Sequence, residues 1–92
     1  MNCRNSLEKN LDRIFSNLEM KVENIPFGKN DYVVLDASGE TLGLLKLSMS
    51  GNFLEYFDDE FEEDLSEACF NVWDKTGMRV RCFYSPVLAG LL

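Results

Sequence analysis

Residues 52–75 read NFLEYFDDEFEEDLSEACFNVWDK, and the interpretation of this stretch decides how the rest of the chain is arranged. Asn52-Phe53-Leu54-Glu55 has the pattern of a helix capping box, and Gly77 stands where helices commonly end. At 100° per residue, five apolar positions of the stretch fall within one arc: Phe57, Phe61, Leu65, Ala68 and Val72. The pattern predicts a helix over residues 53–75 that buries four of them: Phe57, Phe61, Leu65 and Val72.

The sequence on both sides of this helix predicts a first helix and a small sheet. Residues 31–36 and 41–49 are rich in β-branched, aromatic and leucine side chains, and the turn sequence between them predicts a β-hairpin. Residues 20–25 and 78–84 predict two further strands. Helical spacing of apolar residues predicts another helix over residues 6–19. We therefore expect residues 1–92 to form a single acidic α+β domain, with two helices packed on a small mainly antiparallel β-sheet.

The negative charge of the chain is concentrated on the second predicted helix. The net charge is −7, yet the segment between Lys46 and Lys75 holds nine acids and no lysine or arginine. Eight of these acids would lie along about 18 Å of helix, or one charge per roughly 2.2 Å, against about 1.7 Å for duplex DNA. The eight are candidate residues for binding a partner: Glu55, Asp58, Asp59, Glu60, Glu62, Glu63, Asp64 and Glu67. Six should be exposed, because they lie away from the apolar arc: Glu55, Asp58, Asp59, Glu62, Glu63 and Glu67.

Several classes of function are disfavoured by what the sequence lacks. There is no histidine, so the common zinc ligand and every Ser-His or Cys-His catalytic pair are excluded. No glycine-rich phosphate loop occurs, and the acidic run has no central glycine of the kind an EF-hand requires. We expect a protein that is not an enzyme and binds no metal or cofactor. The net charge also argues against direct binding to nucleic acid or to an anionic membrane.

The cysteines indicate a reducing compartment. Cys3, Cys69 and Cys82 are an odd number without CxxC spacing, and Cys69 and Cys82 fall on or beside apolar faces. We interpret them as reduced thiols, with Cys69 and Cys82 packed in the core of a cytoplasmic protein.

An acidic helix of this kind has three interpretations that the charge run alone does not separate. It could be a solvated face without a partner, a mimic of DNA, or the binding face of an immunity or antitoxin protein that covers one basic toxin or nuclease. Like charges at i,i+4 oppose helix formation, and interspersed lysines would have avoided this repulsion. Tyr56, Phe70 and Trp73 lie off the main apolar arc. They either add a core contact or form a protein interface.

The chain as a whole resembles the Arn anti-restriction proteins of T-even bacteriophages. The resemblance covers the chain length, the opening MNCRNSLEK at residues 1–9, the acidic stretch at residues 57–64 and the apolar C-terminal tail. It implies a DNA mimic that works in the cytoplasm of an infected bacterial cell. Its target would be the host McrBC restriction endonuclease, which cuts DNA containing modified cytosines, so the function would be evasion of host defence.

The C-terminal tail predicts self-association. Val87, Leu88, Leu91 and Leu92 follow Pro86 with no polar residue among them. Such a tail either folds back on its own sheet or covers a partner, and we expect a homodimer. A dimer would combine two acidic helices and lengthen the charged surface.

Overall fold

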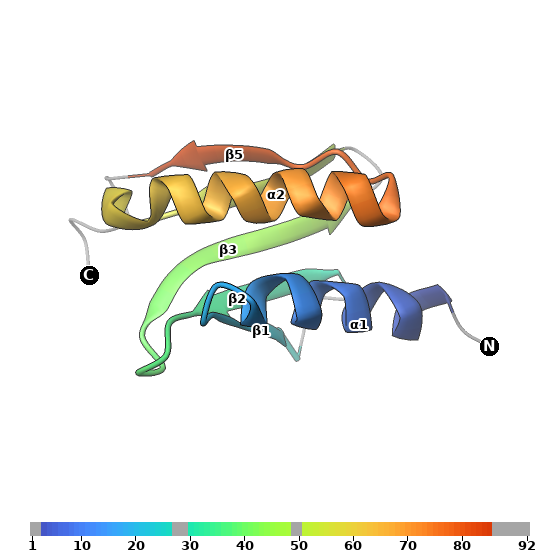
Figure 1. The fold of residues 1–92 in the computed structure, drawn as a ribbon, viewed down its shortest axis with the longest axis horizontal. Helices are drawn as coiled ribbons and strands as arrows, with labels where there is room; N and C mark the ends of the chain where they lie inside the picture. The colour runs from blue at the N-terminus through green and yellow to red at the C-terminus, as the bar shows by residue number, and fades with distance from the viewer. Residues whose placement is uncertain (1–2, 27–29, 49–50, 86–92) are drawn as a thin grey trace.

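The computed structural model describes residues 3–26, 30–48 and 51–85, with side chains from Leu7 onward (Figure 1). The described chain forms two α-helices, one short 3-10 helix and five strands. In chain order they are α1 (Cys3–Ser16), β1 (Lys21–Asn24), β2 (Asp31–Leu35), β3 (Thr41–Ser48), β4 (Gly51–Tyr56), η1 (Asp59–Phe61), α2 (Glu62–Thr76) and β5 (Arg81–Tyr84).

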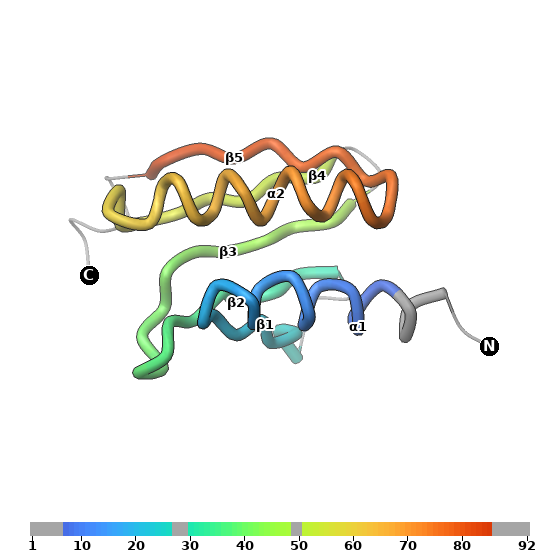
Figure 2. Tube along the Cα trace, in the orientation of Figure 1, coloured from blue at the N-terminus to red at the C-terminus, as the bar shows by residue number. Residues whose placement is uncertain are grey.

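The five strands form one sheet in the order β1-β2-β3-β4-β5. Neighbouring strands from β1 to β4 pair antiparallel. Strand β5 pairs parallel to β4, because α2 returns the chain to the edge of the sheet at which β4 begins. Helices α1 and α2 contact each other and lie side by side on one face of the sheet (Figures 1 and 2). The predicted α+β fold, with two helices on a mainly antiparallel sheet, is confirmed.

The core lies between the helices and the sheet. The inward face of α2 contributes Leu65, Ala68, Cys69 and Val72, and α1 contributes Leu11, Ile14 and Phe15. Inward residues of the sheet complete a single cluster, among them Val34, Leu45 and Leu54. Cys69 is buried, Cys82 is half-buried and both are free thiols, as the core-packing interpretation requires.

The predicted boundaries of three elements were wrong, and one of these errors changes the topology. Residues 51–56 are strand β4 and not the first turn of a helix, so the Asn52–Glu55 capping pattern is coincidental. The register pairs Leu45 with Leu54 and Gly43 with Tyr56, which turns Leu54 and Tyr56 into the core. Strand pairing across β3 and β5 outweighs the local helix signal here. In addition, α1 spans Cys3–Ser16 instead of residues 6–19, and β5 begins only at Arg81.

The revised start of α2 also changes the predicted burial. Leu65 and Val72 are buried as expected. Phe57 and Phe61 precede α2 and are only partly buried, so the prediction that both are core residues was wrong. Phe61 still packs against the edge of the core. Glu55 is half-buried on β4, so its expected full exposure was wrong as well.

Candidate partner-binding surface

The acidic segment begins with a short 3-10 turn that leads into α2. The Asp58 carboxylate accepts a hydrogen bond from the backbone N–H of Glu60 at 3.0 Å and so caps η1. Glu62, Glu63 and Asp64 then form the first turn of α2. Carboxylates are favourable at a helix N-terminus because the backbone dipole is positive there, which offsets part of their mutual repulsion. The sequence can therefore hold this many acids at this end of a helix.

Seven of the eight predicted acids form one exposed group, and the eighth does not belong to it. The seven are Asp58, Asp59, Glu60, Glu62, Glu63, Asp64 and Glu67. Glu55 alternates with Leu54 and Tyr56 along β4, so it lies on the sheet face that the helices do not cover. There it pairs with Leu44 on β3 and with Phe83 on β5. We therefore remove Glu55 from the group and call the seven exposed acids the acidic surface.

The outermost line of α2 is set by helical geometry. With 100° between residues, Glu63, Glu67, Phe70 and Asp74 lie within a narrow stripe opposite the buried Leu65, Ala68 and Val72. All four residues of this stripe are exposed. The helical part of the acidic surface therefore continues directly into this stripe.

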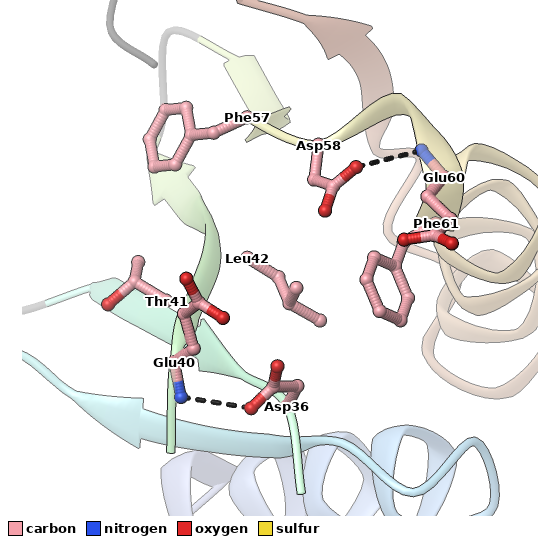
Figure 3. A pocket seen from close by; sticks show the side chains of 8 residues that line it. All are labelled: Asp36, Glu40, Thr41, Leu42, Phe57, Asp58, Glu60 and Phe61. Atoms are coloured by element: carbon pink, nitrogen blue, oxygen red, sulfur yellow. Dashed lines mark hydrogen bonds between the residues drawn. The ribbon is translucent and has the colours of Figure 1, made fainter. Parts of the chain in front are cut away.

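Two further acids lie beside the acidic surface, and sequence reasoning missed them. A cavity of about 390 Å³ is lined by Asp36 and Glu40 from the β2–β3 turn and by Asp58 and Glu60 from the segment that leads into α2. Figure 3 shows the two pairs of carboxyl-bearing residues on opposite sides of Leu42 and Phe61. An arginine or lysine of a partner would find acids around an apolar floor here. Only the tertiary fold brings residues 36–40 next to residues 58–60, so no local sequence signal could have revealed the cavity.

Asp36 is held in its charged form by its own turn. The Ser38 hydroxyl donates to Asp36 Oδ1 at 2.7 Å, and the backbone N–H groups of Glu40 and Ser38 each donate at 2.9 Å. These donors, the Ser38 hydroxyl first, lower the pKa of the Asp36 carboxyl below its ordinary value. Asp36 is therefore an ionised and positioned carboxylate at neutral pH.

Glu62 is tied to the core through Tyr56. Burial raises the pKa of Tyr56 to about 12, and a hydrogen bond to Glu62 together with the negative charges of Glu62 and Asp59 adds to the effect. Tyr56 is a buried residue of β4, so this contact links the first residue of α2 to the sheet. Of the acids in the first turn, Glu62 thus has a structural role alongside any role in binding.

The three aromatic residues that the sequence assigns to either the core or an interface, Tyr56, Phe70 and Trp73, differ in their burial. Tyr56 is a core residue, whereas Phe70 and Trp73 are 60% and 47% exposed. Their rings lie edge to face with centroids 6.2 Å apart. The Arg79 guanidinium lies over the Trp73 ring at 5.3 Å from its centroid. Phe70 and Trp73 are therefore an exposed aromatic pair that continues the acidic surface toward the C-terminal end of α2.

The described residues offer groups for binding but not a recognisable metal centre. Among residues 3–26, 30–48 and 51–85, no three potential ligands are arranged to hold a metal ion. None of the helices in these ranges is long and apolar enough to cross a membrane. The acidic surface can attract cations by electrostatics and accept hydrogen bonds from arginine and lysine side chains.

The chain was compared with protein-family models, with curated proteins and with solved structures. None of the three comparisons found a match. Function is therefore inferred from the acidic surface and its neighbours.

Proposed function

We propose that this protein binds a basic DNA-binding protein in place of DNA, and that the acidic surface is its binding site. The proposed mode of action is competition, since an occupied DNA-binding face cannot receive a duplex. It requires no cofactor and changes no covalent bond. The observation that carries the proposal is a run of seven exposed carboxylates, from Asp58 to Glu67, with no cation among them.

The spacing of these charges supports the proposal even without Glu55. The segment from Asp58 to Glu67 spans about 15 Å, allowing for the longer rise of the 3-10 turn. Seven carboxylates over that length give one charge per about 2 Å, close to the value of about 1.7 Å for duplex DNA. Asp36 and Glu40 widen the charged area beyond the helix. A surface that had evolved to bind phosphates would meet a similar density of negative charge here.

The way in which α2 is held also supports the proposal. Leu65, Ala68 and Val72 fix the inner side of α2 to the core, and Tyr56 contacts its first residue. The backbone that carries the acids therefore keeps its shape when a partner approaches, so the conformational entropy lost on binding is mainly that of the exposed side chains. An acidic disordered tail would have the charge but not this order.

The proposed target is a McrBC-type restriction endonuclease of a bacterial host, and the proposed location is the cytoplasm of the infected cell. This assignment comes from the resemblance to phage anti-restriction proteins, and the acidic surface is the part of the molecule that would serve it. A restriction enzyme exposes a basic face to the phosphate backbone, which is complementary to Asp58–Glu67.

An inhibitor dedicated to one basic toxin or nuclease is the second candidate. The exposed pair Phe70 and Trp73 favours it, because duplex DNA presents no aromatic side chains for a partner to recognise. The number of targets separates the two candidates. A mimic of DNA competes for several unrelated DNA-binding proteins, whereas a dedicated inhibitor binds one.

The test is competition for purified McrBC endonuclease against a methylated duplex, at salt concentrations from about 50 to about 200 mM. We expect the protein to displace the duplex and its affinity to fall at least about tenfold over this range, because the same basic residues are engaged. The double variant Asp59→Lys with Glu63→Lys should abolish the competition and leave the fold intact, since both side chains are exposed.

The matched control makes the same change of charge away from the acidic surface. Asp12 on α1 and Glu23 on β1 are exposed acids on the other half of the molecule. Their double replacement by lysine should leave competition nearly unchanged. Equal losses for both double variants, or an affinity that does not respond to salt, would contradict charge mimicry. Binding to one basic nuclease alone, out of a panel of unrelated DNA-binding proteins, would favour the second candidate.

A further inference from the structure

The exposed pair Phe70 and Trp73 is not explained by the fold. Phe70 is 60% exposed and Trp73 is 47% exposed, although burial of an aromatic ring is among the largest apolar contributions to folding. A polar residue at either position would serve an outward helix face better. The pair also borders a shallow hollow of about 410 Å³ that is lined by Phe70, Trp73 and Asp74. Apolar surface beside a hollow of this size is typical of a contact site.

The pair is also held in position before any partner arrives. The edge-to-face contact orients the two rings, and the Arg79 guanidinium covers one face of Trp73. The backbone following α2 is fixed as well, since the Gly77 N–H donates to the Trp73 carbonyl at 2.8 Å and the Asn52 side chain donates to the Arg79 carbonyl at 3.3 Å. Rigid aromatic side chains lose little entropy on binding and are frequent energetic centres of protein interfaces.

The charges around the pair indicate which partner it fits. Glu63 and Glu67 precede Phe70 on the same stripe, and Asp74 follows it. Asp74 has Lys75 Nζ at 3.9 Å, so the strongest uncompensated negative charge lies on the N-terminal side, toward the acidic surface. A complementary partner therefore carries an apolar side chain for the hollow and basic side chains next to it on that side.

A second copy of this chain fits the same face poorly. Every charged residue on the outermost line of α2 is an acid, so a two-fold packing of α2 against its copy would place Glu67 opposite Glu67 or Asp74. Like charges in such positions oppose association.

We propose that Phe70 and Trp73 form an apolar anchor that inserts against a hydrophobic side chain of a basic protein partner, while the acidic surface engages that partner's lysines and arginines. This deepens the proposed function, on which it rests for the basic character of the partner. DNA offers no equivalent of this anchor. The anchor therefore adds a component of binding that salt does not screen, and it selects among basic proteins.

The experiment uses two synthetic helical peptides of identical positive charge. One carries leucines at i,i+3,i+4 spacing between lysines, and in the other each leucine is replaced by glutamine. Trp73 is the single tryptophan of the chain, so its fluorescence reports on the anchor directly. We expect the leucine peptide to shift the Trp73 emission to the blue and to bind at least about tenfold more tightly than the glutamine peptide. Phe70→Ser should remove this difference between the peptides.

A matched control, a second Phe70 variant and one double charge variant separate the possible causes. Phe83 is an exposed aromatic of β5 at 44% exposure, and Phe83→Ser should preserve the difference between the peptides. Phe70→Gln repeats the test with a better helix former, and circular dichroism checks the fold of each variant. The double variant Asp59→Lys with Glu63→Lys should lower the affinity for both peptides by the same factor. That last result bears on the proposed function, whereas the Phe70 result bears on the anchor.

Equal affinity of the wild-type protein for the two peptides would overturn the proposal, as would an equal effect of Phe83→Ser. The proposal is also overturned if light scattering shows a doubled mass that only the Phe70 variants return to 10.6 kDa, because a second copy would then cover the pair.

Discussion

At the scale of single residues, Tyr56 joins the fold to the acidic surface. It pairs with Gly43 across β3–β4, its ring stacks on Tyr84 with centroids 5.4 Å apart, and it contacts Glu62. The carboxylate of Glu62 accepts a hydrogen bond from the phenol and, with Asp59, disfavours the phenolate. A residue that sequence reasoning left between core and interface therefore belongs to the core while it sets the start of α2.

The raised pKa of Tyr56 leads to a test in alkaline solution. The folded protein holds this proton up to a pH of about 12, whereas the unfolded chain releases it near the ordinary pKa of 10.0. The stability that Tyr56 contributes is therefore complete below pH 10 and is lost as the pH rises toward 12. We expect the ultraviolet absorbance of tyrosinate to show Tyr56 ionising late. Tyr56→Phe should remove that late transition and should be less stable than the wild type at neutral pH. A late transition whose amplitude is unchanged in Tyr56→Phe would refute the assignment.

At the scale of elements, the β3–β4 pairing is the part of the fold that local patterns did not predict. The helices were placed approximately, because their apolar positions recur at helical spacing, and the hairpin of β2 and β3 was placed because a turn sequence separates its strands. Leu54 falls within the helical arc and Glu55 lies away from it, so the pattern gave no reason to separate these residues from α2. The decision depends on strands β3 and β5, which flank β4 in the sheet and whose pairing no local pattern reveals.

The same reasoning explains which part of the site was predicted. Seven of the eight acids were found because the absence of basic residues is visible in the linear sequence. Glu55 does not belong to the acidic surface, because the residues around it fit a helical pattern and yet form strand β4. Asp36 and Glu40 were missed because they reach the site only through the β2–β3 turn, and Phe70 and Trp73 were left undecided because helical angle alone does not tell what covers a given face.

Gly43 offers a direct test of the β3–β4 pairing. A Cβ atom at this position would lie 2.5 Å from the carbonyl oxygen of Glu55, so the two strands would have to separate. We expect Gly43→Ala to lower the free energy of unfolding by about 1–3 kcal/mol, as overpacking commonly does. Urea denaturation measures the loss. Gly39→Ala adds the same methyl group where no atom lies within 4 Å, although at a φ of +92°, and should lose about 1 kcal/mol. An unchanged midpoint for Gly43→Ala would contradict the close approach of the strands.

At the scale of the whole molecule, the homodimer expected from the C-terminal tail stays a prediction, because residues 86–92 lie outside the described residues. We expect light scattering at micromolar concentration to give about twice the chain mass of 10.6 kDa. Deletion of residues 87–92 should then yield the monomer, since the deletion removes the apolar side chains that would be covered. A wild-type mass near 10.6 kDa would reject the dimer. The Phe70 variants should keep the mass of the wild type, because the anchor is expected to lie outside the dimer contact.

The two sides of α2 also determine how the chain can change over generations. On α2, the core constrains Leu65, Ala68 and Val72. The outward residues Glu63, Glu67 and Phe70 belong to the same helix but do not pack in the core. Substitutions on the outer side should leave abundance in the cell unchanged and alter only the partners recognised. A saturation library scored separately for abundance and for binding should divide the positions of α2 into two classes that alternate with the helical period. Such a helix lets a protein follow an evolving target by substitutions on one side, with no need for compensating changes in the other.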